Sequence, residues 1–168
     1  MSIVPIYTDC EGVKQDAIAG VSQKHIPHSN LVHIPTGCDA LLPKSLPELV
    51  PAIKQRMAPL VSSNPHDWCA TIQRGFFSEG SYWYLTGIVA LKRPDDDEVV
   101  INILSSVPFP KEISKAMFEN FDSRFDLMKL IVPLWGKGTH SMYEALAKEP
   151  EKDWMQVGLR TCIKSLLI

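Results

Sequence analysis

The chain lacks a long apolar run, a surplus of basic residues and a recognisable export signal. Its apolar runs are far shorter than the roughly 20 residues that a membrane-spanning helix needs, and residues 1–12 carry no basic or apolar leader. With 17 basic and 19 acidic residues, the formal net charge is −2, so no positive field favours nucleic acid. We therefore expect a cytoplasmic protein with no membrane segment and no nucleic-acid partner.

Closely spaced cysteines are also missing. The four cysteines stand at positions 10, 38, 69 and 162, with no C-x-x-C pair, and without an export signal the expected state is four reduced thiols. His25, His28 and His33 precede Cys38, but only His28 and His33 have a spacing that resembles a zinc-ligand pair. We interpret this segment as a loop with scattered histidines, and we expect no metal and no cofactor.

What remains is the composition of an ordinary globular domain. The chain has 168 residues, of which 45% are hydrophobic and 21% charged. A chain of this length buries roughly 70% of its unfolded surface and needs neither a metal nor a disulfide to fold. We predict a single domain over 1–168. Because prolines and histidines gather near the start, residues 1–44 are expected to be a loop-rich segment.

The strongest local pattern predicts an antiparallel meander within about 68–106. Residues 82–91 are rich in aromatic and β-branched side chains, residues 94–97 read as a Pro-Asp turn, and residues 98–104 resume the strand pattern. An earlier strand over 68–74 precedes this hairpin. The sequence therefore predicts at least three antiparallel strands with helices packed on them, which is the α+β class.

Helical spacing of apolar residues predicts the remaining elements. One stripe runs from Lys111 to Ile131, and a second covers 151–167 at the end of a helical C-terminal third. Ser45 with Glu48 has the spacing of a capping box before a helix over 46–60, and 12–21 is expected to form a short helix. The C-terminal stripe is expected to dock on its own domain, or alternatively on a second copy to form a homodimer.

Cys10 stands directly before the helix predicted over 12–21. A helix N-terminus favours the thiolate, so a cysteine at this position can be a nucleophile. The pattern Asp9-Cys10-x-Gly12-x-x-Gln15 resembles the nucleophile segment of NlpC/P60-type cysteine peptidases, in which a D-C-S-G motif opens a helix; Glu11 stands where that family has serine. The resemblance implies His66 as the base and Glu79 as the polar residue that orients it.

Two further segments have both a functional and a plain interpretation. Tyr82, Trp83 and Tyr84 are aromatic residues of the kind that anchor protein interfaces, although packing within the core explains them as well. The segment 136–139, Gly-Lys-Gly-Thr, lies before a possible helix and could hold a phosphate. Because the first glycine of the Walker pattern is missing, we interpret this segment as a turn between helices.

Two functional hypotheses follow from these residues. The first is a small intracellular, non-enzymatic protein that binds another protein, as an immunity protein, an inhibitor or a chaperone does, with Tyr82, Trp83 and Tyr84 at the contact. The alternative is a cysteine hydrolase of peptidase or amidase type, with Cys10 as nucleophile, His66 as base and Glu79 as orienting group.

Overall fold

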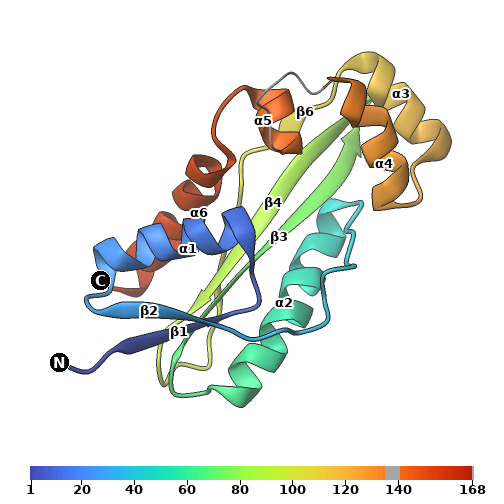
Figure 1. Ribbon diagram of the computed structural model, residues 1–168. Coiled ribbons are helices and arrows are strands. Elements are labelled where there is room, and N and C mark those ends of the chain that lie inside the picture. Colours follow the sequence, from blue (N-terminus) through green and yellow to red (C-terminus); the bar gives the residue numbers. More distant parts are fainter. Residues whose placement is uncertain (135–140, 168) are drawn as a thin grey trace.

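A computed structural model describes residues 1–134 and 141–167, and in it a six-stranded sheet carries helices on both faces (Figure 1). The strands are β1 (Val4–Thr8), β2 (Ser29–His33), β3 (Trp68–Glu79), β4 (Tyr82–Lys92), β5 (Val100–Ile103) and β6 (Val107–Pro108). The helices are α1 (Gly12–His25), α2 (Leu46–Ser63), α3 (Lys111–Asn120), α4 (Arg124–Ile131), α5 (Met142–Ala147) and α6 (Glu151–Leu166), with a 3₁₀ turn at Val132–Leu134.

The sheet is mixed, with strand order β2-β1-β3-β4-β5, and β6 pairs with β4. β3, β4 and β5 form the expected antiparallel meander, with β3 and β4 in register from Cys69 opposite Lys92 to Glu79 opposite Tyr82. Gly80, at φ +57°, supplies the backbone conformation of the tight turn between them. The predicted meander is only part of the sheet, which is not a pure antiparallel meander, because β1 pairs parallel with both β2 and β3.

The first 44 residues are more regular than the sequence suggested. The expected loop-rich segment holds β1, α1 and β2, which form a β-α-β unit with parallel strands. β2 is short and its side chains alternate between partly buried and exposed. β2 pairs with β1 only after the chain has passed through α1, so the sequence around β2 carries little strand signal.

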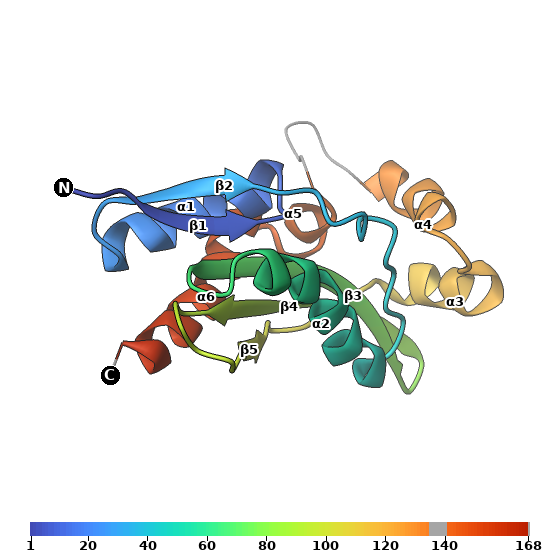
Figure 2. The ribbon, with the colours of Figure 1, turned by 90° about the horizontal axis from the view of Figure 1, so that it is seen from below.

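Helices cover the two faces of the sheet in separate layers. α1 and α6 pack against each other on one face and bury the larger apolar core, whereas α2 packs on the opposite face over β3 and β4. Figure 2 shows α2 in front of the sheet with α1 and α6 behind it. The two connections that leave β1 and β2 therefore pass over opposite faces, which makes the carboxyl end of β1 a switch point of the topology.

The helical stripe predicted from Lys111 to Ile131 is divided into α3 and α4. Ser123 and Asp126 form a capping box in which each side chain accepts a hydrogen bond from the other residue's backbone N–H, and this starts the new helix. Before it, the Lys44 ammonium donates to the carbonyls of Phe121 and Asp122 at 3.0 and 3.1 Å. The chain therefore turns where Lys44 binds carbonyl groups at the end of α3 and the capping box binds backbone N–H groups at the start of α4.

The other predicted helices are present with changed details. The helix expected over 12–21 continues to His25 as α1, and the helix expected over 151–167 is α6. Ser45 does precede α2, but its side chain caps nothing among the described residues, and Glu48 accepts instead from the Lys44 backbone N–H at 2.6 Å. No helix in the described part of the chain is both long and apolar enough to cross a membrane.

Candidate binding groove

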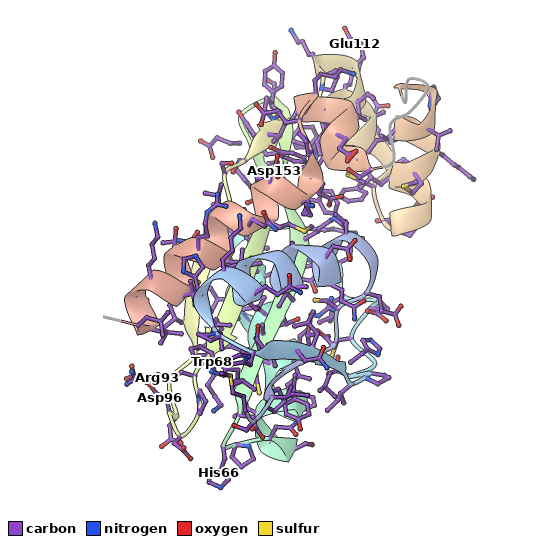
Figure 3. The ribbon with its side chains drawn as sticks, turned by 60° about the vertical axis from the view of Figure 1, so that its left-hand side comes forward. His66, Trp68, Arg93, Asp96, Glu112 and Asp153 are labelled. Carbon is purple, nitrogen blue, oxygen red and sulfur yellow. The ribbon has the colours of Figure 1, made fainter. Side chains whose placement is uncertain are left out.

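The structure does not bring the predicted nucleophile, base and orienting group together. The Cys10 thiol is buried after β1, where it lies 3.7 Å from both Asp9 Oδ1 and Thr71 Oγ1. The His66 side chain is 81% exposed and its Nδ1 lies 2.6 Å from Asp95 Oδ1. Figure 3 shows His66 at the opposite end of the molecule from Glu112, in the connection before β3. His66 is therefore not placed to act as the general base of Cys10, which is the role that the resemblance implied.

Glu79, the predicted orienting residue, is at the far end of β3. It is exposed and pairs across the hairpin with Tyr82. His66 precedes the start of the same strand, so the length of β3 separates the two side chains. The cysteine hydrolase hypothesis therefore has no geometric support from its three residues.

The three predicted contact aromatics lie in different surroundings. Tyr82 is 38% exposed at the start of β4. Trp83 is buried among Phe118 and Phe121, with ring centroids 5.6 and 5.2 Å away, so it belongs to the core. Tyr84 points to the opposite face, half-buried, and stacks on Phe77 at 4.9 Å.

Asp9, directly after β1, is the centre of a buried polar network at the switch point. Its Oδ1 accepts from Thr71 at 2.5 Å, and its Oδ2 accepts from Thr36 at 2.7 Å and from Arg56 Nε at 2.8 Å. Burial opposes ionisation of this carboxyl, but the hydrogen bond from Thr71 and the charge of Arg56 outweigh it and lower the pKa of Asp9. The carboxylate is therefore charged and fully occupied by partners within the chain.

Arg56, on α2, spreads this network toward the connection between β2 and α2. The side chains of Arg56 and Asp9 are only 1% and 2% exposed. Arg56 Nη1 donates to Gln73 Oε1 at 3.1 Å, and Nη2 lies 3.5 Å from Asp39. Gln73 in turn donates to the Leu41 carbonyl at 3.2 Å. A buried ion pair is tolerated only when such further hydrogen bonds satisfy its remaining groups.

Cys38 fastens the same connection to the C-terminal half of α2. Pro59 lies inside the helix and has no N–H, so the Gln55 carbonyl one turn earlier loses its intrahelical donor. The Cys38 thiol lies 3.8 Å from that Gln55 carbonyl and 3.6 Å from the Thr36 carbonyl, so its one proton is shared between the two acceptors. A cysteine expected to be an ordinary reduced thiol thus lies beside the carbonyl that Pro59 leaves without a donor.

Pro43 fastens the end of the connection to the edge of β3. The Phe76 backbone N–H donates to the Pro43 carbonyl at 2.9 Å. At Gly75 a side chain is excluded, because a Cβ there would collide with the Leu49 side chain and lie 3.5 Å from Pro43. The glycine allows the connection and α2 to approach the strand closely. Residues 34–43 are therefore held at several points, by side chains from β3, α2 and Asp9.

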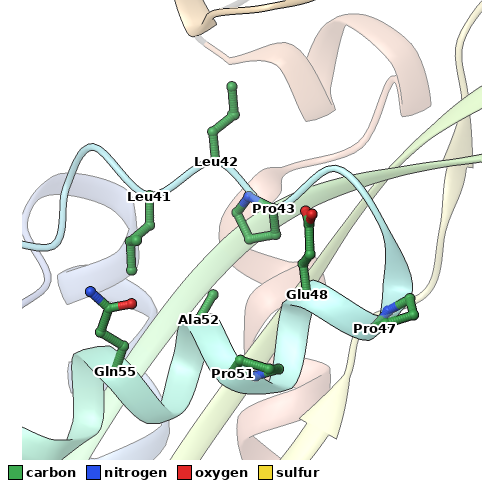
Figure 4. Close-up of a pocket in the computed structure, with 8 residues that line it drawn as sticks. All are labelled: Leu41, Leu42, Pro43, Pro47, Glu48, Pro51, Ala52 and Gln55. Atoms are coloured by element: carbon green, nitrogen blue, oxygen red, sulfur yellow. The ribbon is translucent and has the colours of Figure 1, made fainter.

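Between this connection and α2 lies an apolar groove with a cavity volume of about 420 Å³. Figure 4 shows Leu41, Leu42 and Pro43 along one wall and the first turns of α2 along the other. We call this feature the α2 groove; its lining residues are Leu41, Leu42, Pro43, Pro47, Glu48, Pro51, Ala52 and Gln55. Three prolines and a tethered wall make its shape stable before anything binds.

Sequence reasoning missed this groove, although one signal for the network was available. Ile53, Arg56, Met57 and Leu60 follow the apolar spacing of α2, so a charged residue stands on the stripe that faces the core. A buried arginine requires a carboxylate partner. Asp9, the residue directly before Cys10, is that partner.

Other sequence candidates add no chemistry to the groove. Within the described residues, no group of three or more His, Cys, Asp and Glu side chains is arranged to hold a metal. His33 Nε2 lies 3.4 Å from Glu11, and His28 adopts a positive φ in the turn before β2. The segment 136–139, interpreted above as a turn, lies outside the described residues.

Comparison with known proteins supports the fold alone. No protein-family model matches the sequence, and no curated protein is similar to it in sequence. Among solved structures, protein VC0702 from Vibrio cholerae is similar, with a TM-score of 0.73 over 99% of this chain and 96% of that one. The two sequences are 11% identical over this alignment. The chain therefore shares the architecture of VC0702, and its function must be argued from its own residues.

Proposed function

We propose that this protein binds another protein without catalysing a reaction, and that the α2 groove receives an apolar segment of the partner. The observation that supports the proposal most directly is the combination of an open apolar groove with a wall fixed by the Asp9–Arg56 network. A preformed groove loses little conformational freedom on binding, and this favours affinity. An inhibitor, an immunity protein or a chaperone acts through such a surface.

The chemistry of the network agrees with a non-catalytic role. Both oxygens of Asp9 accept hydrogen bonds from within the chain, and Arg56 is engaged through Nε, Nη1 and Nη2. A general base needs a free lone pair within hydrogen-bond reach of its substrate. These buried groups instead hold the backbone that shapes the groove.

The lining of the α2 groove indicates what it would accept. Its walls are proline, leucine and alanine side chains, and the polar groups are confined to Glu48 and Gln55. Apolar walls with a few polar groups are typical of recognition sites, in which the polar groups fix orientation. We expect the partner to insert one or two leucine-sized or aromatic side chains and to hydrogen bond with Gln55 at the rim.

A selection experiment tests this proposal. The probe is a random peptide library displayed on phage, selected on the wild-type protein. Enriched peptides are then measured by calorimetry against a Pro51→Lys/Gln55→Lys double variant. Both positions are exposed on α2, so the fold is retained while charge enters the groove. We expect peptides rich in apolar residues whose affinity falls at least tenfold in the double variant.

Ala58→Lys is the matched control, because Ala58 is exposed on the same helix and does not line the groove. It should leave the affinity of the selected peptides unchanged. Absence of any enriched peptide, or equal binding to the double variant, would overturn the proposal.

A further inference from the structure

β5 leaves one edge of the sheet open. It is the last strand in the order and pairs only with β4 in the part of the chain that the structure describes. The Leu104 backbone N–H donates to Gly87 at 2.8 Å, so the alternation of an antiparallel pair directs the N–H and C=O groups of Ile101 and Ile103 away from β4. Figure 2 shows β5 at the outer edge of the sheet. Such an edge can pair with a further strand.

A second pocket, of about 250 Å³, lies between this edge and α6. Tyr143 and Trp154 form its inner wall as a stacked pair with centroids 4.3 Å apart. Trp154 Nε1 donates to the Ser105 carbonyl at 2.9 Å, which ties the helix to the strand. Gly158 lies in the lining, and a Cβ there would collide with the Leu104 side chain. The walls are therefore fixed, as those of the α2 groove are.

Among the described residues that line this edge pocket, the charged side chains are all acidic. Glu149 and Asp153 are exposed at its rim, and Asp153 lies in the first turn of α6 (Figure 3). The Tyr143 hydroxyl donates to Glu149 Oε2 at 3.4 Å. Burial, reinforced by the negative charge of Glu149, raises the pKa of Tyr143. The pocket thus has a negative potential that favours a cation.

Apolar side chains flank the acidic pair. Ile103 is 51% exposed on the strand and Val157 is 57% exposed on the helix, and both line the pocket. An extended peptide has side chains that alternate in direction. A segment with one cationic residue among β-branched ones would match this edge, with its backbone on the strand, its cation in the pocket and its neighbours on the apolar flanks.

We propose that the β5 edge takes an extended segment of a partner protein as an added strand, and that a lysine or arginine of this segment lies between Glu149 and Asp153. The opposite edge, β2, is a poorer site, because its neighbouring pocket has one carboxylate, Asp16, and is otherwise lined mainly by neutral polar side chains such as Gln15 and Gln23. The proposal does not depend on the α2 groove, which belongs to the other face of the sheet. It uses strand addition, in which main-chain hydrogen bonds give affinity and a side-chain pocket gives specificity.

Synthetic peptides test the proposal directly. The probe is a blocked pentapeptide of alternating valine and threonine with a central arginine, titrated into the full chain and followed by NMR. We expect saturable binding with shifts centred on residues 101–105 and 149–157. Norleucine in place of the arginine should weaken binding at least tenfold. An N-methylated version, which cannot form the strand hydrogen bonds on one edge, should also lose at least tenfold.

Protein variants separate the pocket from general charge. Glu149→Gln/Asp153→Asn removes the rim charges, and Asp97→Asn/Glu98→Gln removes two exposed charges from the β4–β5 turn. We expect the first pair to weaken binding tenfold and the second to change it less than twofold. No saturable binding at millimolar peptide would overturn the proposal. Equal affinity of the norleucine or N-methylated peptide, or equal loss in both double variants, would also overturn it.

Discussion

Asp9 shows how a single carboxylate can decide the pH dependence of this fold. Its pKa is lowered in the folded state, so its stabilisation is complete above the unfolded pKa of about 3.9 and is lost as the pH falls through the lower folded value. Asp9→Asn removes the buried counter-charge of Arg56 and leaves only the exposed Asp39 carboxylate, 3.5 Å from Nη2, so at pH 7 it should cost about 3–5 kcal/mol.

Denaturant unfolding of the wild type and Asp9→Asn between pH 7 and pH 2 measures this effect. The difference in free energy of unfolding should be largest near pH 7. It should narrow below about pH 4, because the Asp9 carboxyl of the unfolded chain then binds a proton while the folded carboxyl, with its lowered pKa, is still charged. Asp97→Asn, at an exposed position of the turn before β5, is the control and should be close to neutral at pH 7. A difference that stays constant to pH 2 would contradict the assignment to the Asp9 charge.

The cysteine side chains lead to a second prediction at the residue scale. Burial raises the pKa of Cys69 and of Cys162 to about 11. Because only the thiolate is alkylated readily, iodoacetamide at pH 8 should modify neither residue in the native protein within the time that an unfolded control reacts completely. Mass spectrometry of the digested protein locates the label. Rapid native labelling of Cys162 would show that α6 opens far more often than its packing indicates.

At the scale of elements, α6 is the part whose docking can be tested most simply. Its apolar stripe packs on α1, β4 and β5 of the same chain, and Ile163 and Leu166 are 1% and 9% exposed. Deleting residues 163–168 removes two buried side chains worth roughly 1.5–3 kcal/mol each, so thermal unfolding should occur at a much lower temperature. Leu167→Ser, at a position that is 52% exposed, should change the melting temperature little.

Two helical glycines provide a matched pair. Alanine favours a helix over glycine by about 1 kcal/mol. At Gly20 of α1 the added Cβ would meet only the amide end of Gln156, a flexible group, so Gly20→Ala should be neutral or stabilising. At Gly158 of α6 it would collide with Leu104, which is buried, and lie 3.1 Å from Val89. At Gly158 the cost of overpacking, about 1–3 kcal/mol, should outweigh the gain in helix propensity that alanine gives. Equal denaturation midpoints for the two variants would refute the close approach of α6 to the sheet.

These elements also show why the sequence predicted part of the fold. β3 and β4 are long, rich in aromatic and β-branched residues and joined by a tight turn, and α6 has one apolar stripe, so the patterns of these elements are local and readable. β1 and β2 are short, and β1 lies beside β3, which follows about 60 residues later. Pairing over that distance leaves no local pattern. The α2 groove was hidden for the same reason, since its walls meet only after β1, α2 and β3 are in place.

At the scale of the whole molecule, the switch point links stability to the shape of the α2 groove. Thr36 and Thr71 each donate one hydrogen bond to Asp9, but Thr36 lies in the connection that forms the groove wall and Thr71 lies in β3. Variants of the two threonines therefore distinguish the stability that the network contributes from its role in holding the connection. Replacing either by valine removes one charge-assisted hydrogen bond, worth about 1.5–3 kcal/mol.

Thr36→Val and Thr71→Val should both lower the free energy of unfolding, but only Thr36→Val should loosen the groove. Hydrogen exchange of the Leu41 amide, which donates to the Cys38 carbonyl, should accelerate in Thr36→Val by more than global unfolding explains, because local opening needs fewer broken contacts. Peptides selected on the wild-type groove should bind this variant more weakly, although Thr36 does not line the groove, since a mobile wall must be ordered on binding. Thr71→Val should retain the wild-type affinity at temperatures where it is folded. Equal exchange and equal affinity in the two variants would mean that the network stabilises the sheet without shaping the binding surface.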